Sequence, residues 1–507
     1  MNPESWFKDL TAYFILLLLV STLGPLLFGY HLAELNAPQD VITCKKKSLS
    51  LAISPSLPQC IPMNSGEFGL VSSIFTLGGL LGALASGPVS ARYGRYRTML
   101  MTTIPFVIGP VLSLFASNIG LLIAGRLISG LGAGSAVVIV PLYISEIAPP
   151  EEKGFFGAFT QIMINMGIFI AQLLGYFLSK GQMWRIILAV GGAIGLAQAI
   201  GLALAGQESP KWLAERGEGK KAKAILRKIR GHEADVDEEI TGWGLQSAED
   251  MHDEEQSLLH NEEREPSNPN AQPSAASQTT MKDVGNEAER EMIGVIGVLM
   301  SPESRPAVFA VMGIMVAQQL LGINSIVMYG VSLLSDLLKA NAALLTVAVA
   351  GFNIIITTAA APLPDKLGRK TCLLLSITGM GISSLLLAIG IMKSLEVLSA
   401  IAVLTFVGSF GIGLGPIPFI LSSELVDSKA VGATQSWALA ANWIATFVVA
   451  QFFPIVNEKL GKGKVYFVFA GLAAIFFVFV VWRVPETKGK ADVDEVWGRK
   501  SSSRNVD

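Results

Sequence analysis

Twelve long apolar stretches constrain this chain more than any other feature. A bilayer core about 30 Å thick is crossed by a helix of about 20 apolar residues. Stretches of that length lie near 11–33, 68–90, 98–117, 119–141, 155–178, 184–206, 305–331, 341–363, 371–392, 398–424, 431–453 and 464–484. Charged residues make up only 15% of the 507, which excludes a soluble multidomain enzyme. The sequence predicts an all-α membrane protein with 12 transmembrane helices.

The distribution of Lys and Arg predicts the orientation in the membrane. Basic residues gather at 92–97, 211–230, 366–370 and 483–490, which fall on one side if each half has six helices. By the positive-inside rule this side is cytoplasmic, and both termini lie there. The start MNPESWFKDL lacks the features of a removable signal peptide, so we expect the first helix to stay in the mature protein.

A charged insert separates two halves of six helices. Residues 233–291 carry 17 acidic and 3 basic side chains, which leaves a net charge of +12 on the rest of the chain. Residues 209–231 have helical spacing with a basic face and predict short helices, whereas the acidic part has the composition of a disordered segment. We expect an N-terminal half (1–206), a cytoplasmic insert (207–304), a C-terminal half (305–484) and a cytoplasmic tail (485–507).

The two halves contain an internal repeat. SGPVSARYGRYRTMLM at 86–101 and AAPLPDKLGRKTCLLL at 360–375 share a helix end rich in small residues, a Gly-Arg turn and a basic cluster, with Gly94 and Gly368 at corresponding positions. Two such halves predict a carrier in which the halves rock about a central site, so that access alternates between the two sides.

Polar side chains inside the predicted helices are mostly amides: Gln161, Asn165, Gln318, Gln319, Asn324, Asn353 and Asn442. Amides donate and accept hydrogen bonds without a net charge, which suits a ligand made of hydroxyls, and nearby aromatic rings could stack on a sugar. The alternative is that each amide only joins helices, a contribution of about 0.6 kcal/mol on average. The set as a whole favours a neutral polyol as the ligand.

Ten motifs, in order along the chain, carry a family resemblance: FGYHLAELNAPQ (28–39), ARYGRYR (91–97), GRLISGLGAG (125–134), PLYISE (141–146), QESPKWL (207–213), QQLLGIN (318–324), DKLGRK (365–370), GPIPFILSSEL (415–425), NW (442–443) and PETKGK (485–490). By these motifs the chain resembles the sugar porters of the major facilitator superfamily, most closely the facilitative glucose transporter type. The first motif is similar to that of fungal members.

The resemblance implies roles for particular residues. Those expected to bind substrate are Gln161, Gln318, Gln319, Asn324, Asn353, Phe419, Asn442 and Trp443. Those expected to form gates and helix breaks are Gly322, Tyr329, Pro416 and Pro418. A cytoplasmic salt-bridge latch would hold that side shut while the other is open, and it comprises Arg92, Arg95, Glu146, Lys153, Glu208, Asp365, Arg369, Lys370, Glu424 and Glu486.

The chain departs from the family's glucose carriers at the substrate positions. It has Phe419 where they have Trp and Gly411 where they have Glu, and Met315, Val316 and Ala317 replace their QLS signature. Because these changes remove hydrogen-bonding groups, the selectivity of the site is expected to differ.

His31 bears on the mode of transport, since proton-coupled members of the family carry Asp at this position. An imidazole titrates near neutrality and could take that role. Counting about 1.5 Å per residue along the first helix places His31 near the outer interface. We therefore expect His31 and Glu34 to be outer-vestibule residues and the protein to be a uniporter. The alternatives are proton symport through His31, and a sugar receptor that binds without transport.

Two further features concern the loops. Cys44 and Cys60 share the first outer loop, where they form either a disulfide or two free thiols. EEQSLL at 254–259 resembles an acidic dileucine sorting signal, with Glu254, Leu258 and Leu259 as its elements, and suggests a vacuolar or endosomal membrane, with the plasma membrane as the alternative. By the family resemblance we expect a functional monomer. We expect that it is not an enzyme and has no cofactor or metal, because no phosphate loop, metal cluster or nucleophile arrangement is found.

Overall fold

The structure is a computed structural model that describes residues 11–46, 57–149, 153–231, 236, 239, 295–338, 341–461, 463–490 and 493–499. Every regular element in these ranges is helical. Twelve helical spans are long and apolar enough to cross a membrane. The predicted fold class is therefore confirmed, and the chain is an integral, multi-pass membrane protein.

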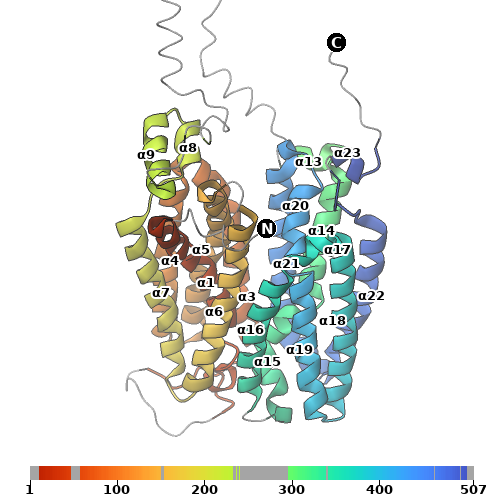
Figure 1. Cartoon of the computed structure of the whole chain (residues 1–507). Helices are drawn as coiled ribbons and strands as arrows, with labels where there is room; N and C mark the ends of the chain where they lie inside the picture. Colours follow the sequence, from red (N-terminus) through yellow and green to blue (C-terminus); the bar gives the residue numbers. More distant parts are fainter. Residues whose placement is uncertain are drawn as a thin grey trace, which may run out of the picture.

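The N-terminal half contains six of these spans (Figure 1), which are α1 (Ala12–Ala33), α3 (Ser65–Tyr93), α4 (Arg95–Leu114), α5 (Ile119–Ile147), α6 (Lys153–Leu178) and α7 (Trp184–Ala205). Polar residues fix several helix starts. Asn64 and Glu67 form a capping box on α3, in which each side chain accepts from the backbone N–H of the other residue, at 2.8 and 2.7 Å.

In the C-terminal half two of the six spans are broken. The first consists of α14 (Arg305–Leu320) and α15 (Ile323–Leu338), and the fourth of α19 (Glu396–Ile412) and α20 (Ile417–Glu424). The unbroken spans are α16 (Asn341–Ala360), α18 (Arg369–Met392), α21 (Val431–Leu460) and α22 (Val465–Arg483). The breaks fall at Gly322 and at the GPIP segment, which are the places where the motifs indicate them.

Short helices lie at the ends of the bundle, and they are α2 (Gln39–Ile42), α8 (Pro210–Glu215), α9 (Gly219–Arg230), α13 (Gly297–Met300), α17 (Leu363–Leu367), α23 (Val493–Val496) and a 3-10 helix (Ser428–Ala430). Helices α8, α9 and α23 share one end, which we call the insert side, at the top of Figure 1. The opposite end carries the loop between α1 and α3, and we call it the disulfide side.

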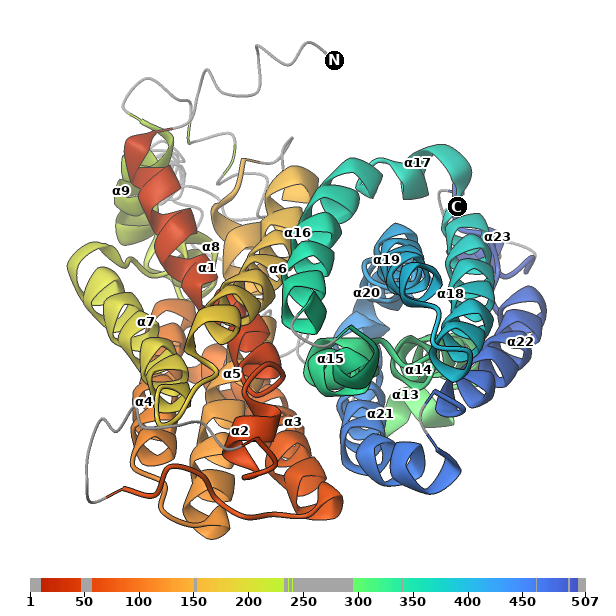
Figure 2. The same ribbon diagram turned by 90° about the horizontal axis from the view of Figure 1, so that it is seen from below.

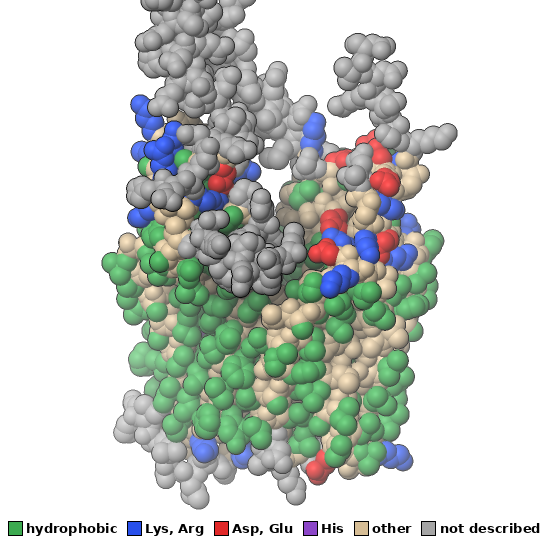
Figure 3. Space-filling model, in the orientation of Figure 1, with side chains coloured by type: hydrophobic (Ala, Val, Ile, Leu, Met, Phe, Trp, Pro, Cys, Tyr) green, Lys and Arg blue, Asp and Glu red, His purple; other side chains and the backbone are tan. Residues whose placement is uncertain are grey.

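An apolar belt surrounds the molecule. Large hydrophobic side chains such as Ile104, Ile355 and Trp482 are exposed on the outer faces of the helices. Figure 3 shows apolar side chains over the middle of one face of the molecule, between two rims where most of the charged groups of that face lie. Such a belt matches the hydrocarbon core of a bilayer.

The two halves lie side by side (Figure 2) and meet along two helix pairs, α3 with α21 and α6 with α16. The halves separate toward the insert side, where Figure 3 shows a notch between their upper ends. Residues 233–291, expected to be disordered, lie outside the described residues except for 236 and 239, and so does the dileucine segment at 254–259.

Candidate functional site

Four of the predicted substrate-binding amides form one hydrogen-bonded chain on α14, α15 and α21. Asn324 donates to Gln319 (2.6 Å), Gln319 donates to Gln318 (3.0 Å), and Asn442 donates to the same Gln318 oxygen (2.5 Å). The side chains of Gln318, Gln319 and Asn324 are buried. The chain holds several neutral donors and acceptors at fixed positions inside the protein.

This amide chain continues into the broken helix α19–α20. Pro418 has no N–H, so the carbonyl of Leu414 lacks its helical partner. The Gln318 amide donates to this carbonyl at 2.6 Å and to the carbonyl of Gly415 at 3.1 Å. The proline segment around Pro416 thus supplies acceptors that a continuous helix would not expose.

A second group of amides crosses between the halves. Asn165 on α6 donates to Thr357 on α16 (3.1 Å), Thr357 donates to Asn353 (3.3 Å), and Asn353 donates back to Asn165 (3.3 Å). The three side chains thus form a closed ring. Gln161, one turn before Asn165, donates to the Asn165 side-chain oxygen at 3.3 Å. Gln161 and Asn353 are predicted substrate-binding residues. Asn165 is one of the predicted intramembrane amides but has no predicted substrate role, and Thr357 is not among the predicted residues.

The two predicted aromatic contacts lie in different surroundings. Trp443 is 4% exposed and packs across the boundary between the halves, with its ring edge-on to Phe28 at 5.6 Å and against Gly79. Phe419 on α20 is 44% exposed. Trp443 therefore helps to close the boundary between the halves, while Phe419 is accessible.

Two of the predicted gating residues, Gly322 and Tyr329, lie at the start of α15 and within it, whereas Pro416 and Pro418 lie at the break before α20 and in α20. Gly322 separates α14 from α15 with φ +95°, a conformation that side-chain-bearing residues rarely adopt. Tyr329 donates to the carbonyl of Ala450 at 2.5 Å and lies edge-on to Phe68 of the other half. On the disulfide side, helix α15 therefore contacts the N-terminal half as well as α21 of its own half.

In the described part of the chain, the hydrogen bonds between the halves are all found at the level of Asn165 or closer to the disulfide side. They join Asn36 to Ile326 and Val331, Ser73 and Gly66 to Gln451, Gln172 to Val327 and Thr346, and Asn165 to Asn353 and Thr357. The structure is thus closed on the disulfide side.

The predicted latch residues form two separate networks on the insert side. Arg95 pairs with Glu146 at 2.7 Å in the N-terminal half, and Arg369 pairs with Glu424 at 2.9 Å and with Asp365 at 2.9 Å in the C-terminal half. Among the described residues, no ion pair connects the N-terminal network to the C-terminal one.

Each network also caps a helix, and the two caps correspond. The carboxylate of Glu208 accepts from the backbone N–H groups of Arg95 and Tyr96 (2.6 and 3.0 Å), and Glu486 accepts from those of Arg369 and Lys370 (2.8 and 3.1 Å). These carboxylates satisfy the free donors at the starts of α4 and α18.

The remaining latch residues are less central. The Arg92 guanidinium lies over the ring of Tyr93, and the Lys370 ammonium donates to the carbonyl of Val481 at 2.9 Å. The side chain of Lys153 lies outside the described residues.

His31 lies in a buried cluster of polar and charged groups. Its Nδ1 is 3.0 Å from one carboxylate oxygen of Glu34, and Arg126 donates to the other at 2.6 Å. Arg126 also donates to the His31 carbonyl at 2.7 Å and lies over the ring of Phe75. We call His31, Glu34 and Arg126 the buried triad, because their exposed fractions are only 0%, 2% and 1%.

The expectation that His31 and Glu34 line an outer vestibule is therefore wrong. Distance along a helix gives depth in the membrane, whereas exposure depends on what packs around the helix. Here Phe75, Phe106 and Arg126, from three other helices, cover the end of α1. Arg126 was missed as a functional candidate, although a lone cation inside the apolar stretch 119–141 is a recognisable signal.

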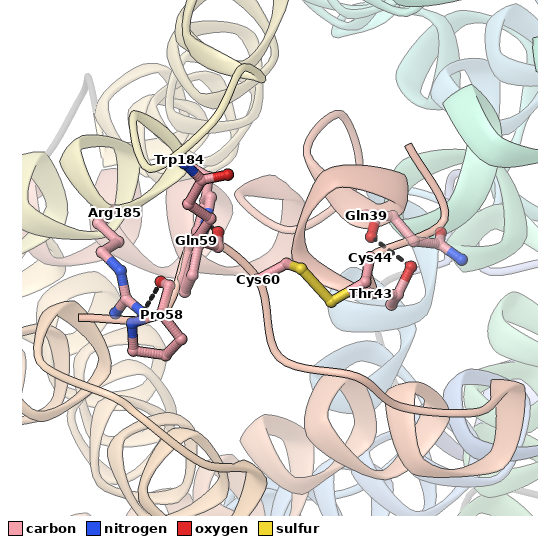
Figure 4. The surroundings of a disulfide bond; sticks show 8 residues. All are labelled: Gln39, Thr43, Cys44, Pro58, Gln59, Cys60, Trp184 and Arg185. Carbon is pink, nitrogen blue, oxygen red and sulfur yellow. Dashed lines mark hydrogen bonds between the residues drawn. A yellow bond between two sulfur atoms is a disulfide. The ribbon is translucent and has the colours of Figure 1, made fainter. Parts of the chain in front are cut away.

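A disulfide joins Cys44 to Cys60 (Figure 4), with 5.3 Å between their Cα atoms. The loop is also tied to α7, since Arg185 donates to the carbonyl of Pro58 (3.0 Å) and the Trp184 indole to that of Gln59 (2.9 Å). Of the two states left open by the sequence, the structure has the bonded one.

Comparison with known proteins adds the family. The model of the family described as "Sugar (and other) transporter" matches residues 17–262 and 247–497. The chain is 33% identical to the probable metabolite transport protein YBR241C of Saccharomyces cerevisiae, over 96% of each chain. It is 30% identical to the vacuolar protein sorting-associated protein 73 of the same yeast, over 93% of each.

A solved structure supports the fold. The partially occluded inward-open conformation of the xylose transporter XylE from E. coli matches with a TM-score of 0.71 and 23% identity, over 95% of this chain and 100% of that one. The two six-helix halves are therefore those of the major facilitator fold. With the motifs, the fold and the family model in agreement, the chain belongs to the sugar transporter family.

Proposed function

We propose that the protein carries a neutral hexose or related polyol across its membrane by facilitated diffusion with alternating access. The observation that carries this proposal is the amide chain from Asn324 through Gln319 and Gln318 to Asn442. Its members are uncharged and combine donors with acceptors, which matches a ligand whose polar groups are hydroxyls.

The distribution of contacts between the halves supports alternating access. Hydrogen bonds close the disulfide side, while the charged residues of the insert side pair within their own halves. In the opposite state, we propose, the latch residues approach across the boundary and the contacts on the disulfide side separate. We assign the insert side and both termini to the cytoplasm, because most of the Lys and Arg residues lie there.

Uptake of labelled hexoses into proteoliposomes tests the proposal. Wild-type protein should equilibrate the sugar. Gln318→Ala should lower kcat/KM about tenfold or more, because it removes the bonds donated to Leu414 and Gly415 and the oxygen that accepts from Gln319 and Asn442. Gln435→Ala is the matched control, since this amide is exposed on α21. Binding of sugar without uptake would instead establish a receptor.

Proton-coupled symport is a second candidate, and the buried triad favours it. An imidazole bonded to a buried carboxylate is an arrangement from which transporters build proton relays. Facilitated diffusion remains our first choice because Arg126 already neutralises Glu34. A proton on His31 would therefore add a net charge to a buried site.

An imposed proton gradient separates these modes. Sugar accumulation above equilibrium that needs the gradient and is lost in His31→Gln would establish symport and refute facilitated diffusion. Equilibration at a rate that the gradient leaves unchanged would establish the uniporter.

We also propose a vacuolar or endosomal membrane as the location, with the plasma membrane as the alternative. The proposal rests on the EEQSLL segment and on the similarity to a yeast protein named for vacuolar sorting. Changing both Leu258 and Leu259 to Ala should move a fluorescently tagged protein to another membrane. An unchanged location would refute the role of this segment.

A further inference from the structure

We propose that Asn165 and Thr357 form a further hydroxyl-binding subsite that determines which sugar the protein accepts. The inference rests on the proposed function and adds two residues to its site. It starts from the ring of Asn165, Asn353 and Thr357, in which one half supplies one side chain and the other half supplies two.

The ring lies at the end of the closed boundary. Along α6 and α16, toward the disulfide side, Phe169 packs near Gly351 and Gln172 accepts from Thr346. Toward the insert side, the ring is the last polar contact between these helices in the described part of the chain. The halves separate toward the insert side (Figure 3), so the ring lies where the closed part of the boundary meets the open part.

The chemistry of the ring allows exchange with a ligand. Each member both donates and accepts, as a sugar hydroxyl does. The ring bonds measure 3.1 to 3.3 Å, longer than the 2.5 and 2.6 Å of the bonds from Asn442 and Gln318 elsewhere in the site. Since hydrogen bonds weaken with length, a hydroxyl can replace a ring bond more readily than those shorter bonds.

The position of the ring links it to the proposed sugar site. The Asn165 oxygen accepts from both Gln161 and Asn353, two of the proposed substrate-binding amides. On the other side is Gly411, where a Cβ atom would lie 3.4 Å from the Thr357 hydroxyl and 3.5 Å from the Asn353 oxygen. Because glycine places no polar group there, Asn165 supplies the partners of Asn353 and Thr357.

Selectivity follows from the need to satisfy buried polar groups. A sugar with a hydroxyl at the matching carbon replaces a ring bond, whereas an epimer that directs this hydroxyl elsewhere leaves a donor or acceptor unpaired. The ring should therefore affect the ratio of kcat/KM values between epimers, and not only the rate for all sugars.

The test uses an isosteric pair of variants. Thr357→Val removes one hydroxyl from the ring, and Thr358→Val removes the hydroxyl of the next residue, which is exposed and bonds only its own helix at Ile354. Uptake of labelled D-glucose, D-mannose and D-galactose is measured in proteoliposomes. We expect Thr357→Val to change the ratio of kcat/KM between two of these sugars by about 3- to 10-fold, and Thr358→Val to leave it unchanged.

Asn165→Ser serves as a second variant, since it keeps a donor and an acceptor with a shorter reach, and it should change the same ratio. If both ring variants slow all three sugars by one common factor, the ring only joins the halves and the inference is wrong. If the wild type transports no hexose and no related polyol, the proposed function fails, and the inference with it.

Discussion

The ion pair between Glu34 and Arg126 is almost fully removed from water. Separating such a pair by changing one partner leaves an uncompensated buried charge, a loss of about 3–5 kcal/mol. Arg126→Leu should therefore lower the thermal unfolding temperature of the purified protein in detergent strongly. Glu34→Leu combined with Arg126→Leu should be less harmful than Arg126→Leu alone, because no lone charge then remains.

An exposed ion pair provides the control for this prediction. Lys221 and Glu218 are in contact at 2.7 Å, but their side chains are 73% and 42% exposed. Because water screens exposed pairs, Lys221→Gln should leave the unfolding temperature nearly unchanged.

The double variant of the buried pair, Glu34→Leu with Arg126→Leu, decides the cause of the loss. If it is no more stable than Arg126→Leu alone, the charge of Glu34 is not the cause.

The buried pair also shows where sequence reasoning stops at the level of residues. The sequence places Glu34 directly after the apolar stretch 11–33 and Arg126 inside the stretch 119–141, which marks each as unusual. That they meet, 92 residues apart, depends on how α1 packs against α5. The ring at Asn165 depends in the same way on α6 and α16, so the amides could be found from the sequence but their partners could not.

At the level of elements, the starts of α4 and α18 are equivalent structures in the two halves. Gly94 and Gly368 have φ +94° and +100°, and a Cβ atom on either would contact the capping carboxylate of Glu208 or Glu486. Gly368→Ala should destabilise the protein by about 1–3 kcal/mol, because of backbone strain together with this contact. Thermal unfolding in detergent would measure the change.

Gly432 is the matched glycine for this prediction. It lies in the first turn of α21, and a Cβ atom added there would meet nothing within 4 Å. Gly432→Ala should be neutral or stabilise the protein by up to about 1 kcal/mol, since alanine favours helix. Equal destabilisation by both variants would contradict the assignment of strain to Gly368.

The elements themselves could be predicted well, because the length of an apolar stretch is a local property. The ends were less accurate. Helix α21 continues to Leu460 and α5 to Ile147, beyond the predicted 453 and 141. These extensions include Glu458, Lys459 and Glu146, and such polar ends are not identified by a search for apolar stretches.

At the scale of the whole molecule, the balance between the two sides should respond to single contacts between the halves. Asn36, in the turn after α1, donates to the carbonyl of Ile326 at 3.4 Å and accepts from the N–H of Val331 at 3.0 Å, and so holds α15 closed. Asn36→Val removes both bonds, about 1 kcal/mol each. Because a change of about 1.4 kcal/mol shifts a two-state equilibrium tenfold, a measurable fraction of the molecules should close on the insert side.

Double electron–electron resonance between two spin labels would measure this fraction. The labels are attached to cysteines that replace Lys221 and Lys366, which are exposed on the insert side of the two halves, and closure on that side would appear as a shorter distance between them. Asn118→Ala, which removes an amide cap within one half, is the control. If the two variants have the same distance distribution, Asn36 does not hold the disulfide side closed, and the balance between the two states is set by other contacts between the halves, such as those of Trp443 and Tyr329.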